Sequence, residues 1–149
     1  RHALVLAAAG AHVTAVDRDA EALAVLRDRA AAAGLAHLIE TRRADLEPAD
    51  GPWPLAGAQF DAVVVTTDLW RPRHEDLLRA VAPGGCLLHE TFAAGQETVG
   101  RPSRPEFLLQ PGELLARLAG PWRVLAYEDL RLPAPDRFVQ RVLARRLAA

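Results

Sequence analysis

The sequence predicts an α/β protein, with a doubly wound, mostly parallel sheet and an antiparallel strand pair at its C-terminal end. Short β-branched or apolar segments alternate with helical patterns, the order expected of βα units. Residues 60–66 (FDAVVVT) form a continuous apolar run, which is typical of a strand with helices over both faces. Residues 122–130 and 138–147 read as strands with no room for a crossover helix between them, so this last pair is predicted to be antiparallel.

The first third of the chain supplies two βα-like units. Residues 1–9 read as a helix, because Gly10 occupies the usual position just past a helix end. Residues 12–16 (HVTAV) are β-branched and free of Gly and Pro, which favours a strand. Apolar side chains at helical spacing predict a second helix over residues 19–33. A strand at 37–42 and a loop at 47–57 are predicted to follow.

The remaining segments continue the alternation. A helix is predicted at 72–81 and a strand at 86–92, with a Pro-Gly-Gly turn between them. Residues 111–120 read as a helix that starts at Pro111 and is closed by Gly120. Residues 93–110 form a loop longer than is usual in a compact domain, which favours a lid or a binding loop.

Composition limits the class of protein. A chain of 149 residues, half of them hydrophobic, is expected to form one domain. A net charge of −1 gives no indication of a nucleic-acid partner, and no apolar run is long enough to span a membrane. A single cysteine excludes an internal disulfide and a cysteine metal cluster, which suits the cytoplasm. We expect no metal site. Because the chain begins with Arg1 and contains no Met, we also expect that a natural N-terminal segment is missing.

Polar residues follow each of the first four predicted strands. Ligands of open α/β sheets bind outside the carboxyl ends of the strands, where an acidic side chain can accept both hydroxyls of a ribose. Asp17 is the candidate for that role, and capping of the next helix is the alternative, for which Asp19 is better placed. The four strand ends are Asp17-Arg18, Asp45-Leu46, Thr66-Thr67-Asp68 and Glu90-Thr91-Phe92.

Four motifs together resemble a known family. They are VTAVDRD at 13–19, ADL at 44–46, FDAVVVT at 60–66 and APGG at 82–85. In this order they resemble the class I S-adenosylmethionine-dependent methyltransferases, which have a Rossmann-like sheet. The segment FLLQPGEL at 107–114, followed by Trp122 and Tyr127-Glu128, is similar to small bacterial members of the tellurite-resistance type. The family's first strand and Gly-rich turn would precede Arg1 and are absent from this sequence.

The resemblance implies a role for each matching residue. Asp17 would bind the ribose hydroxyls of S-adenosylmethionine, and Arg18 would lie beside the adenine. Asp45 would accept a hydrogen bond from the adenine amino group, with the backbone amide of Leu46 nearby. Thr66 and Thr67 would flank the methionine part. The resemblance implies methyl transfer to a small-molecule acceptor and leaves the oligomeric state open.

The side chains that would face the acceptor come from the ends of the third and fourth strands and the segments after them. Among these, His74 is expected to lie on the surface of its helix. Arg101 and Arg104 in the long loop could attract an anionic acceptor, or could be incidental in a solvated loop. The substrate-side candidates are Asp68, Trp70, Arg71, His74, Glu90, Phe92 and Arg104.

Two alternatives stay open at this point. A nicotinamide-dependent oxidoreductase also places an acid after its second strand. A non-enzymatic remnant of the same fold is the other, although the retention of both Asp17 and Asp45 argues against a decayed site.

Overall fold

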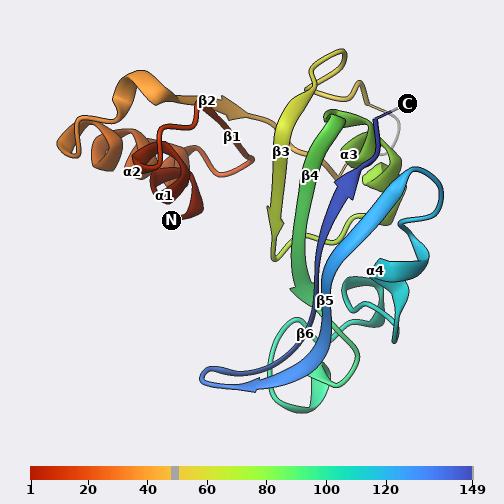
Figure 1. Ribbon diagram of the computed structural model, residues 1–149. Coiled ribbons are helices and arrows are strands. Elements are labelled where there is room, and N and C mark those ends of the chain that lie inside the picture. Colours follow the sequence, from red (N-terminus) through yellow and green to blue (C-terminus); the bar gives the residue numbers. More distant parts are fainter. Residues whose placement is uncertain (48–50, 149) are drawn as a thin grey trace. The chain divides into compact units, whose positions relative to one another are not determined.

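The protein is described by a computed structural model that covers residues 1–47 and 51–148 (Figure 1). The chain divides into two compact units, Arg1–Pro54 and Leu55–Ala149. Each unit is described by itself below. The predicted loop at 47–57 lies partly outside the described residues.

In its described residues, the first unit contains two α-helices and a two-stranded parallel sheet. Its elements are α1 (His2–Ala8), β1 (Val13–Asp17), α2 (Ala20–Ala32) and β2 (Ile39–Arg43). Strands β1 and β2 pair in parallel from Val13↔Ile39 to Asp17↔Arg43. The strand that was predicted at 37–42 starts two residues later, because His37 belongs to the 3₁₀ turn Ala36–Leu38.

Helix α2 begins where its capping residue predicts. The Asp19 carboxylate accepts hydrogen bonds from the backbone N–H groups of Glu21 (2.8 Å) and Ala22 (3.2 Å). These two donors would otherwise lack a partner in the first helical turn. The predicted capping role of Asp19 is therefore confirmed, and it leaves Asp17 available for another role.

The second unit contains a mixed four-stranded sheet with the order β3-β4-β6-β5 (Figure 1). Strands β3 and β4 are parallel, whereas β6 is antiparallel to both β4 and β5, as the short connection predicts. The elements are β3 (Phe60–Thr66), α3 (His74–Ala80), β4 (Val81–Phe92), α4 (Glu113–Ala116), β5 (Trp122–Pro133) and β6 (Asp136–Arg146).

Strands β1 and β3 belong to different sheets. Within the described residues, β1 pairs only with β2, and β3 pairs only with β4. The alternation of strands and helices, with the closing antiparallel pair, agrees with the predicted α/β class.

The boundary between α3 and β4 differs from the prediction. Pro72 lies in a 3₁₀ turn (Arg71–Arg73), α3 ends at Ala80, and β4 already starts at Val81. The Pro-Gly-Gly segment is an irregularity inside β4, because the register with β3 jumps from Phe60↔Val81 to Ala62↔Cys86. A Cβ atom at Gly85 would lie 2.9 Å from the carbonyl oxygen of Asp61, so this close approach requires glycine.

The predicted helix at 111–120 is much shorter than expected. Helix α4 comprises only Glu113–Ala116, and its N-cap is Gly112, which has a φ of 73°. Pro111 therefore lies before the helix and not at its first position. The preceding loop is structured, with 3₁₀ turns at Gln96–Thr98 and Pro105–Phe107.

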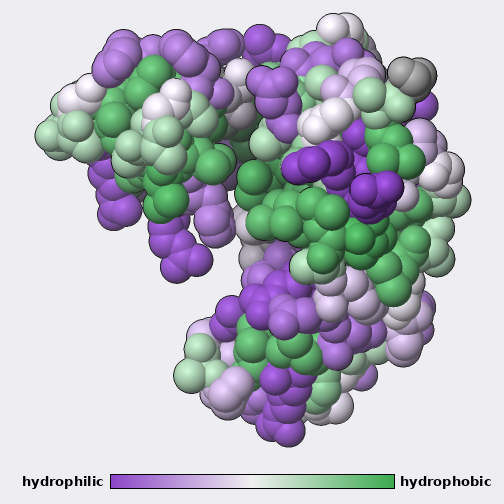
Figure 2. Space-filling view, viewed as in Figure 1, coloured by the Kyte–Doolittle hydropathy of each residue, from purple (hydrophilic) through white to green (hydrophobic). Residues whose placement is uncertain are grey.

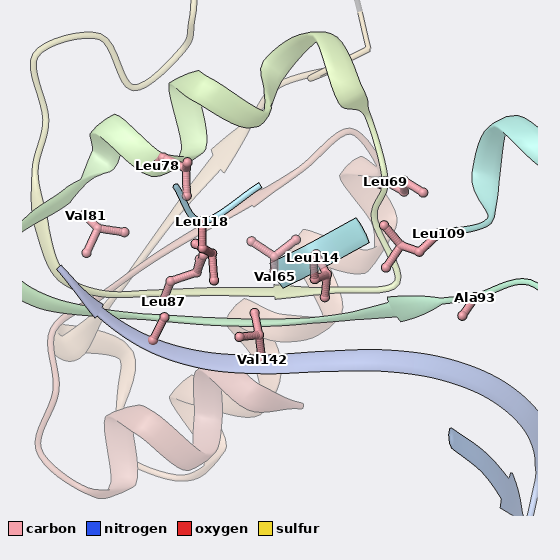
Figure 3. Close-up of a cluster of buried hydrophobic side chains, with 11 residues drawn as sticks. Val65, Leu69, Leu78, Val81, Leu87, Ala93, Leu109, Leu114, Leu118 and Val142 are labelled. Atoms are coloured by element: carbon pink, nitrogen blue, oxygen red, sulfur yellow. The ribbon is translucent and has the colours of Figure 1, made fainter. Parts of the chain in front are cut away.

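The core of the second unit lies on one face of its sheet. Figure 3 shows side chains of the sheet, such as Val65 and Val142, gathered with Leu78 of α3 and Leu114 of α4. Trp122 is partly buried and packs against this cluster.

The other face of this sheet is not covered in the same way. Val64 and Leu88, which are register partners in β3 and β4, are 36% and 40% exposed. Figure 2 shows apolar side chains at the surface over this part of the sheet. Within the second unit, helices α3 and α4 lie on the core side of the sheet.

Candidate functional site

In the first unit, the carboxyl ends of β1 and β2 place two acidic residues next to each other. The backbone N–H of Ala44 donates to the carbonyl oxygen of Asp17 at 3.0 Å, which extends the strand pairing to the residue before Asp45. Both carboxylates are exposed. The parallel register thus places Asp17 and Asp45 at the same edge of the sheet, where ligands of this fold class bind.

Local hydrogen bonds fix these two carboxylates. One oxygen of Asp17, Oδ1, accepts from the backbone N–H of Asp19 at 2.9 Å. Its second oxygen accepts no hydrogen bond from the residues that the structure describes. Oδ1 of Asp45 accepts from the backbone N–H of Glu47 at 3.0 Å. Each carboxylate is therefore oriented by the backbone and keeps acceptor capacity for a ligand.

A basic residue bridges the same edge. The Arg18 guanidinium donates to the carboxylate of Glu47 at 2.8 Å, and Arg43 donates to the carbonyl oxygen of Arg18 at 3.3 Å. Leu46, between the two acids of this segment, is half-buried. Hydrogen bonds thus connect the residues that follow β1 with those that follow β2, and the apolar Leu46 lies among them.

In the second unit, Thr67 has an unusual backbone. Its φ is 58°, in the left-handed region that β-branched residues rarely adopt. Two hydrogen bonds hold this conformation. The backbone N–H of Thr67 donates to the carbonyl oxygen of Glu90 (2.9 Å), and the hydroxyl of Thr67 donates to the carbonyl oxygen of Thr66 (2.7 Å). Strained residues of this kind concentrate at functional sites.

A buried histidine pair lies behind this turn. His89 is 2% exposed, and its Nε2 lies 3.1 Å from the carbonyl oxygen of Asp68. His74 is 5% exposed, so the expected surface position of His74 is wrong. The reason is that α3 starts at His74, which places His74 and Leu78, four residues apart, on the same buried face.

Burial changes the titration of both imidazoles. Desolvation, together with the neighbouring His89 and Arg117, lowers the pKa of His74 to about 4. Desolvation also lowers the pKa of His89. Among the described residues, Nε2 of His74, Nδ1 of His89 and Nε1 of Trp70 are buried without a hydrogen-bond partner.

Arg71 makes four hydrogen bonds within the protein. Its guanidinium binds the Glu113 carboxylate through Nε (2.7 Å) and Nη2 (2.8 Å). It also donates to the carbonyl oxygens of Glu106 and Leu108. These contacts connect two segments of the protein, so Arg71 is not a side chain that is free to bind the methyl acceptor.

The remaining substrate-side candidates are also partly engaged. Glu90 forms an ion pair with Arg141 at 3.5 Å. Arg104 binds Glu106 at 2.5 Å, and its guanidinium carbon lies 5.7 Å from the centre of the Phe107 ring. Phe92 is half-buried at the end of β4.

Within each unit, the structure brings several of the candidates together. Asp17, Arg18 and Asp45 meet at the edge of the first unit, and Thr67 contacts the Glu90 backbone in the second. Sequence reasoning missed Glu113, which binds both Arg71 and Arg117. The spacing of Glu113 and Arg117, four residues apart on a helical segment, was the available signal.

Comparison with known proteins identifies the family. The profile of the methyltransferase domain family matches residues 1–85, which is more than half of the chain. The chain belongs to this family, and the predicted resemblance to class I S-adenosylmethionine-dependent methyltransferases is confirmed. No curated protein matches the sequence.

Solved structures share the fold. TehB from Haemophilus influenzae is 19% identical with a TM-score of 0.75, and the match covers 96% of this chain and 52% of that one. An S-adenosylmethionine-dependent methyltransferase from Methanosarcina mazei is 17% identical with a TM-score of 0.72 (98% and 87% covered). A 16S rRNA (adenine(1408)-N(1))-methyltransferase from Catenulisporales acidiphilia is 20% identical with a TM-score of 0.67 (99% and 79% covered).

The chain spans about half the length of the TehB chain. No helix in the described ranges is long and apolar enough to cross a membrane. Across residues 1–47 and 51–148, no three His, Cys, Asp or Glu side chains gather where they could hold a metal ion.

Proposed function

We propose that the protein transfers a methyl group from S-adenosylmethionine to a small-molecule acceptor that carries negative charge. The observation that carries the proposal is the pairing of Asp17 with the segment of Asp45 at the carboxyl ends of β1 and β2, in a chain of the methyltransferase domain family. When bound, the cofactor supplies an electrophilic methyl group on a sulfonium.

The residues of the first unit suit a nucleoside. Asp17 offers acceptor oxygens for the paired ribose hydroxyls, because only one of them is used by Asp19. We propose that Asp45 accepts from the adenine amino group, with the Leu46 amide nearby. Arg18, which Glu47 holds at the same edge, would lie beside the adenine.

The residues of the second unit suit the reacting end. We propose that Thr66 and Thr67 flank the methionine part, which is supported by the strained backbone of Thr67. Transfer of a methyl group mainly requires alignment of the acceptor and exclusion of water. Trp70 and Phe92 are the proposed apolar walls, and a base is needed only if the acceptor carries a proton.

The negative charge of the acceptor is proposed from the long loop. Arg101, Ser103, Arg104 and Phe107 line a hollow in that loop. Arginine side chains bind oxyanions and carboxylates through their N–H groups. Asp68 and Glu90 remain candidates for a base, although the ion pair of Glu90 with Arg141 weakens its case. We also propose a cytoplasmic location, from the single cysteine.

Calorimetric binding of S-adenosylhomocysteine to the full-length gene product tests the cofactor. We expect Asp17→Asn to weaken binding at least tenfold while it keeps the hydrogen bond from Asp19. Asp28→Ala, at an exposed position of α2, is the matched control and should leave binding unchanged. Binding of a nicotinamide dinucleotide instead would favour the oxidoreductase, and binding of neither would favour the remnant.

Transfer of a labelled methyl group to selenite, arsenite, benzoate and total RNA tests the acceptor. Methylation of one of the three anions is the expected result. The fold of the Catenulisporales acidiphilia rRNA methyltransferase makes RNA the necessary comparison. Methylation of RNA alone would contradict the proposed acceptor and leave the proposed cofactor in place.

A further inference from the structure

Arg71 connects the segment after β3 to the segment after β4. Its guanidinium makes a two-point contact with the Glu113 carboxylate, at 2.7 and 2.8 Å. Two further N–H groups donate to the carbonyl oxygens of Glu106 (2.5 Å) and Leu108 (2.9 Å). Four hydrogen bonds from one side chain therefore fix residues that lie 35 or more positions further along the chain.

Glu113 is shared between several donors. Besides Arg71, it accepts from the side chain of Arg117 (2.7 and 2.9 Å) and from the backbone N–H of Gln110 (2.9 Å). Its side chain is 14% exposed and that of Arg71 is 30% exposed. Ionic hydrogen bonds with this two-point geometry and partial burial are among the stronger ones in proteins.

The segment that this pair holds, residues 93–112, is called the rim segment here. It begins directly at the carboxyl end of β4. Its two ends are joined, because the N–H of Leu109 donates to the carbonyl oxygen of Phe92 and the N–H of Ala94 donates to that of Leu109. The rim segment is therefore closed at its base.

Two buried glutamines also hold the rim segment. Gln140 of β6 is completely buried and donates to the carbonyl oxygen of Gln110 at 2.6 Å. Gln96 is 3% exposed, donates to the carbonyl oxygen of Arg101 at 3.0 Å, and accepts from the N–H of Phe138 at 2.9 Å. Buried amides satisfy loop backbone groups that would otherwise lack partners.

The tip of the rim segment depends on Arg71. The glutamine contacts reach Arg101 and Gln110, whereas the carbonyl oxygens of Glu106 and Leu108 are bound by Arg71. Arg104, the proposed anion ligand, lies between these contacts. Loss of the Arg71 contacts would therefore free the part of the rim segment that carries Arg104.

We propose that Arg71 and Glu113 are positioning residues, whose ion pair holds the rim segment in one conformation as a preformed wall at the carboxyl ends of β3 and β4. The rim segment is then not a lid that opens for each turnover. Its role toward the methyl acceptor rests on the proposed function, whereas the conformational role of the ion pair stands without it.

Amide hydrogen exchange of the whole chain tests the conformational role. Arg71→Gln is expected to accelerate exchange at least tenfold at the backbone N–H groups of residues 104–108 (Pro105 has none), with β4 and β6 unchanged. Arg71→Lys should give an intermediate rate, because lysine keeps the charge and loses the two-point geometry. Arg79→Gln is the matched control, since Arg79 is exposed and paired on α3 itself. Unchanged rates at 104–108 in Arg71→Gln would overturn the proposal.

Proteolysis gives a second measurement that separates local from global opening. A Glu-specific endoproteinase should cleave after Glu106 at least tenfold faster in Arg71→Gln and Glu113→Gln. Cleavage after Glu128, in β5, should keep its rate. Equal acceleration at both sites, or equal acceleration of exchange in β6, would show that the pair serves the stability of the whole unit and would overturn the proposal.

The acceptor role is tested with the anion that the wild-type protein methylates among selenite, arsenite and benzoate. Arg71→Lys is expected to raise KM several-fold more than it lowers kcat, since the acceptor wall is displaced and the cofactor residues are not. An equal loss in kcat with unchanged KM would contradict that role. If the wild-type protein methylates none of the three anions, the proposed acceptor fails, and the exchange experiment still decides the conformational role.

Discussion

The imidazole rings of His74 and His89 are stacked, with their centres 6.1 Å apart and their planes 25° apart. His74 comes from α3 and His89 from β4, so the contact joins a helix to the sheet it covers. Both rings are buried next to the apolar cluster of the second unit. Two neutral imidazoles can share this position, whereas two imidazolium ions would repel each other.

The histidine pair predicts a loss of stability in mild acid. Because the folded state lowers the pKa of His74 from 6.5 to about 4, the unfolded state binds more protons between these values. The stabilisation is fully present above pH 6.5 and is lost as the pH falls toward 4. We expect the free energy of unfolding to decrease by about 2 kcal/mol between pH 7 and pH 4.5, as measured by urea denaturation.

Substitutions test whether His74 causes this pH dependence. His74→Phe, which cannot titrate, should reduce the pH dependence between pH 4.5 and pH 7, with the contribution of His89 remaining. His12→Gln, at an exposed position, should not change it. The groups near His74 are His89 on β4, Glu113 on α4 and Arg117. Hydrogen bonds from Arg71 lower the pKa of Glu113 to about 2, so Glu113 stays ionised over this range. An unchanged profile in His74→Phe would contradict the assignment.

Two glycines of the rim segment are expected to differ sharply when replaced by alanine. Gly95 has a φ of 103°, and a Cβ atom there would lie 2.7 Å from the Phe138 ring. Backbone strain and overpacking together predict a loss of about 2–4 kcal/mol for Gly95→Ala. Gly100→Ala is the matched control, because its nearest contact, with Gln96, is an ordinary 3.5 Å. Equal unfolding free energies for the two variants would contradict this prediction.

The backbone conformation of Thr67 is expected to cost stability, and two substitutions at this position test this. Thr67→Gly removes the steric cost of the left-handed backbone, about 1 kcal/mol, so the free energy of unfolding should stay constant or rise slightly. Thr67→Val keeps that cost and loses the hydroxyl bond to Thr66, and should be less stable by about 1 kcal/mol. Thermal denaturation of both variants compares them. A glycine variant less stable than the valine variant would show that the backbone of Thr67 is not strained.

Asp19 is expected to contribute locally to the first unit. Asp19→Ala removes the N-cap of α2 and should lower the free energy of unfolding of that unit by about 1 kcal/mol. Asp19→Asn should retain most of this stabilisation, because the side-chain oxygen of asparagine can still accept a hydrogen bond from the backbone N–H of Glu21. Asp28→Ala, in the middle of the same helix, should have no unfavourable effect. Far-ultraviolet circular dichroism during urea denaturation follows the transition.

The local elements with strong sequence signals were predictable. The β-branched segment of β1, the apolar run of β3 and the cap at Asp19 follow from interactions between residues that are close in the sequence. The pattern of four motifs was sufficient for the family, which the match over residues 1–85 confirms. The sequence alone therefore determined the α/β class, the order of the elements and the candidate residues at the strand ends.

The predictions that were wrong concern features that depend on distant parts of the chain. Val81 joins β4 because Phe60 offers it a ladder partner, and α4 stops at Ala116 although the pattern around it is helical. The burial of His74 requires a sheet and Leu78 on the same helix face. The role of Arg71 depends on Glu113, which lies 42 residues away.

Local propensity and periodicity therefore determined what each segment of this protein becomes, because they act over one or two helical turns. Only the tertiary structure decided which charged side chains bind each other and which keep an unused hydrogen-bond acceptor. Asp17 keeps an acceptor oxygen at the edge of the first unit, whereas Arg71 uses its N–H groups inside the second. The physical reason is that hydrogen bonds and ion pairs depend on distance in space, which chain topology sets and sequence spacing does not.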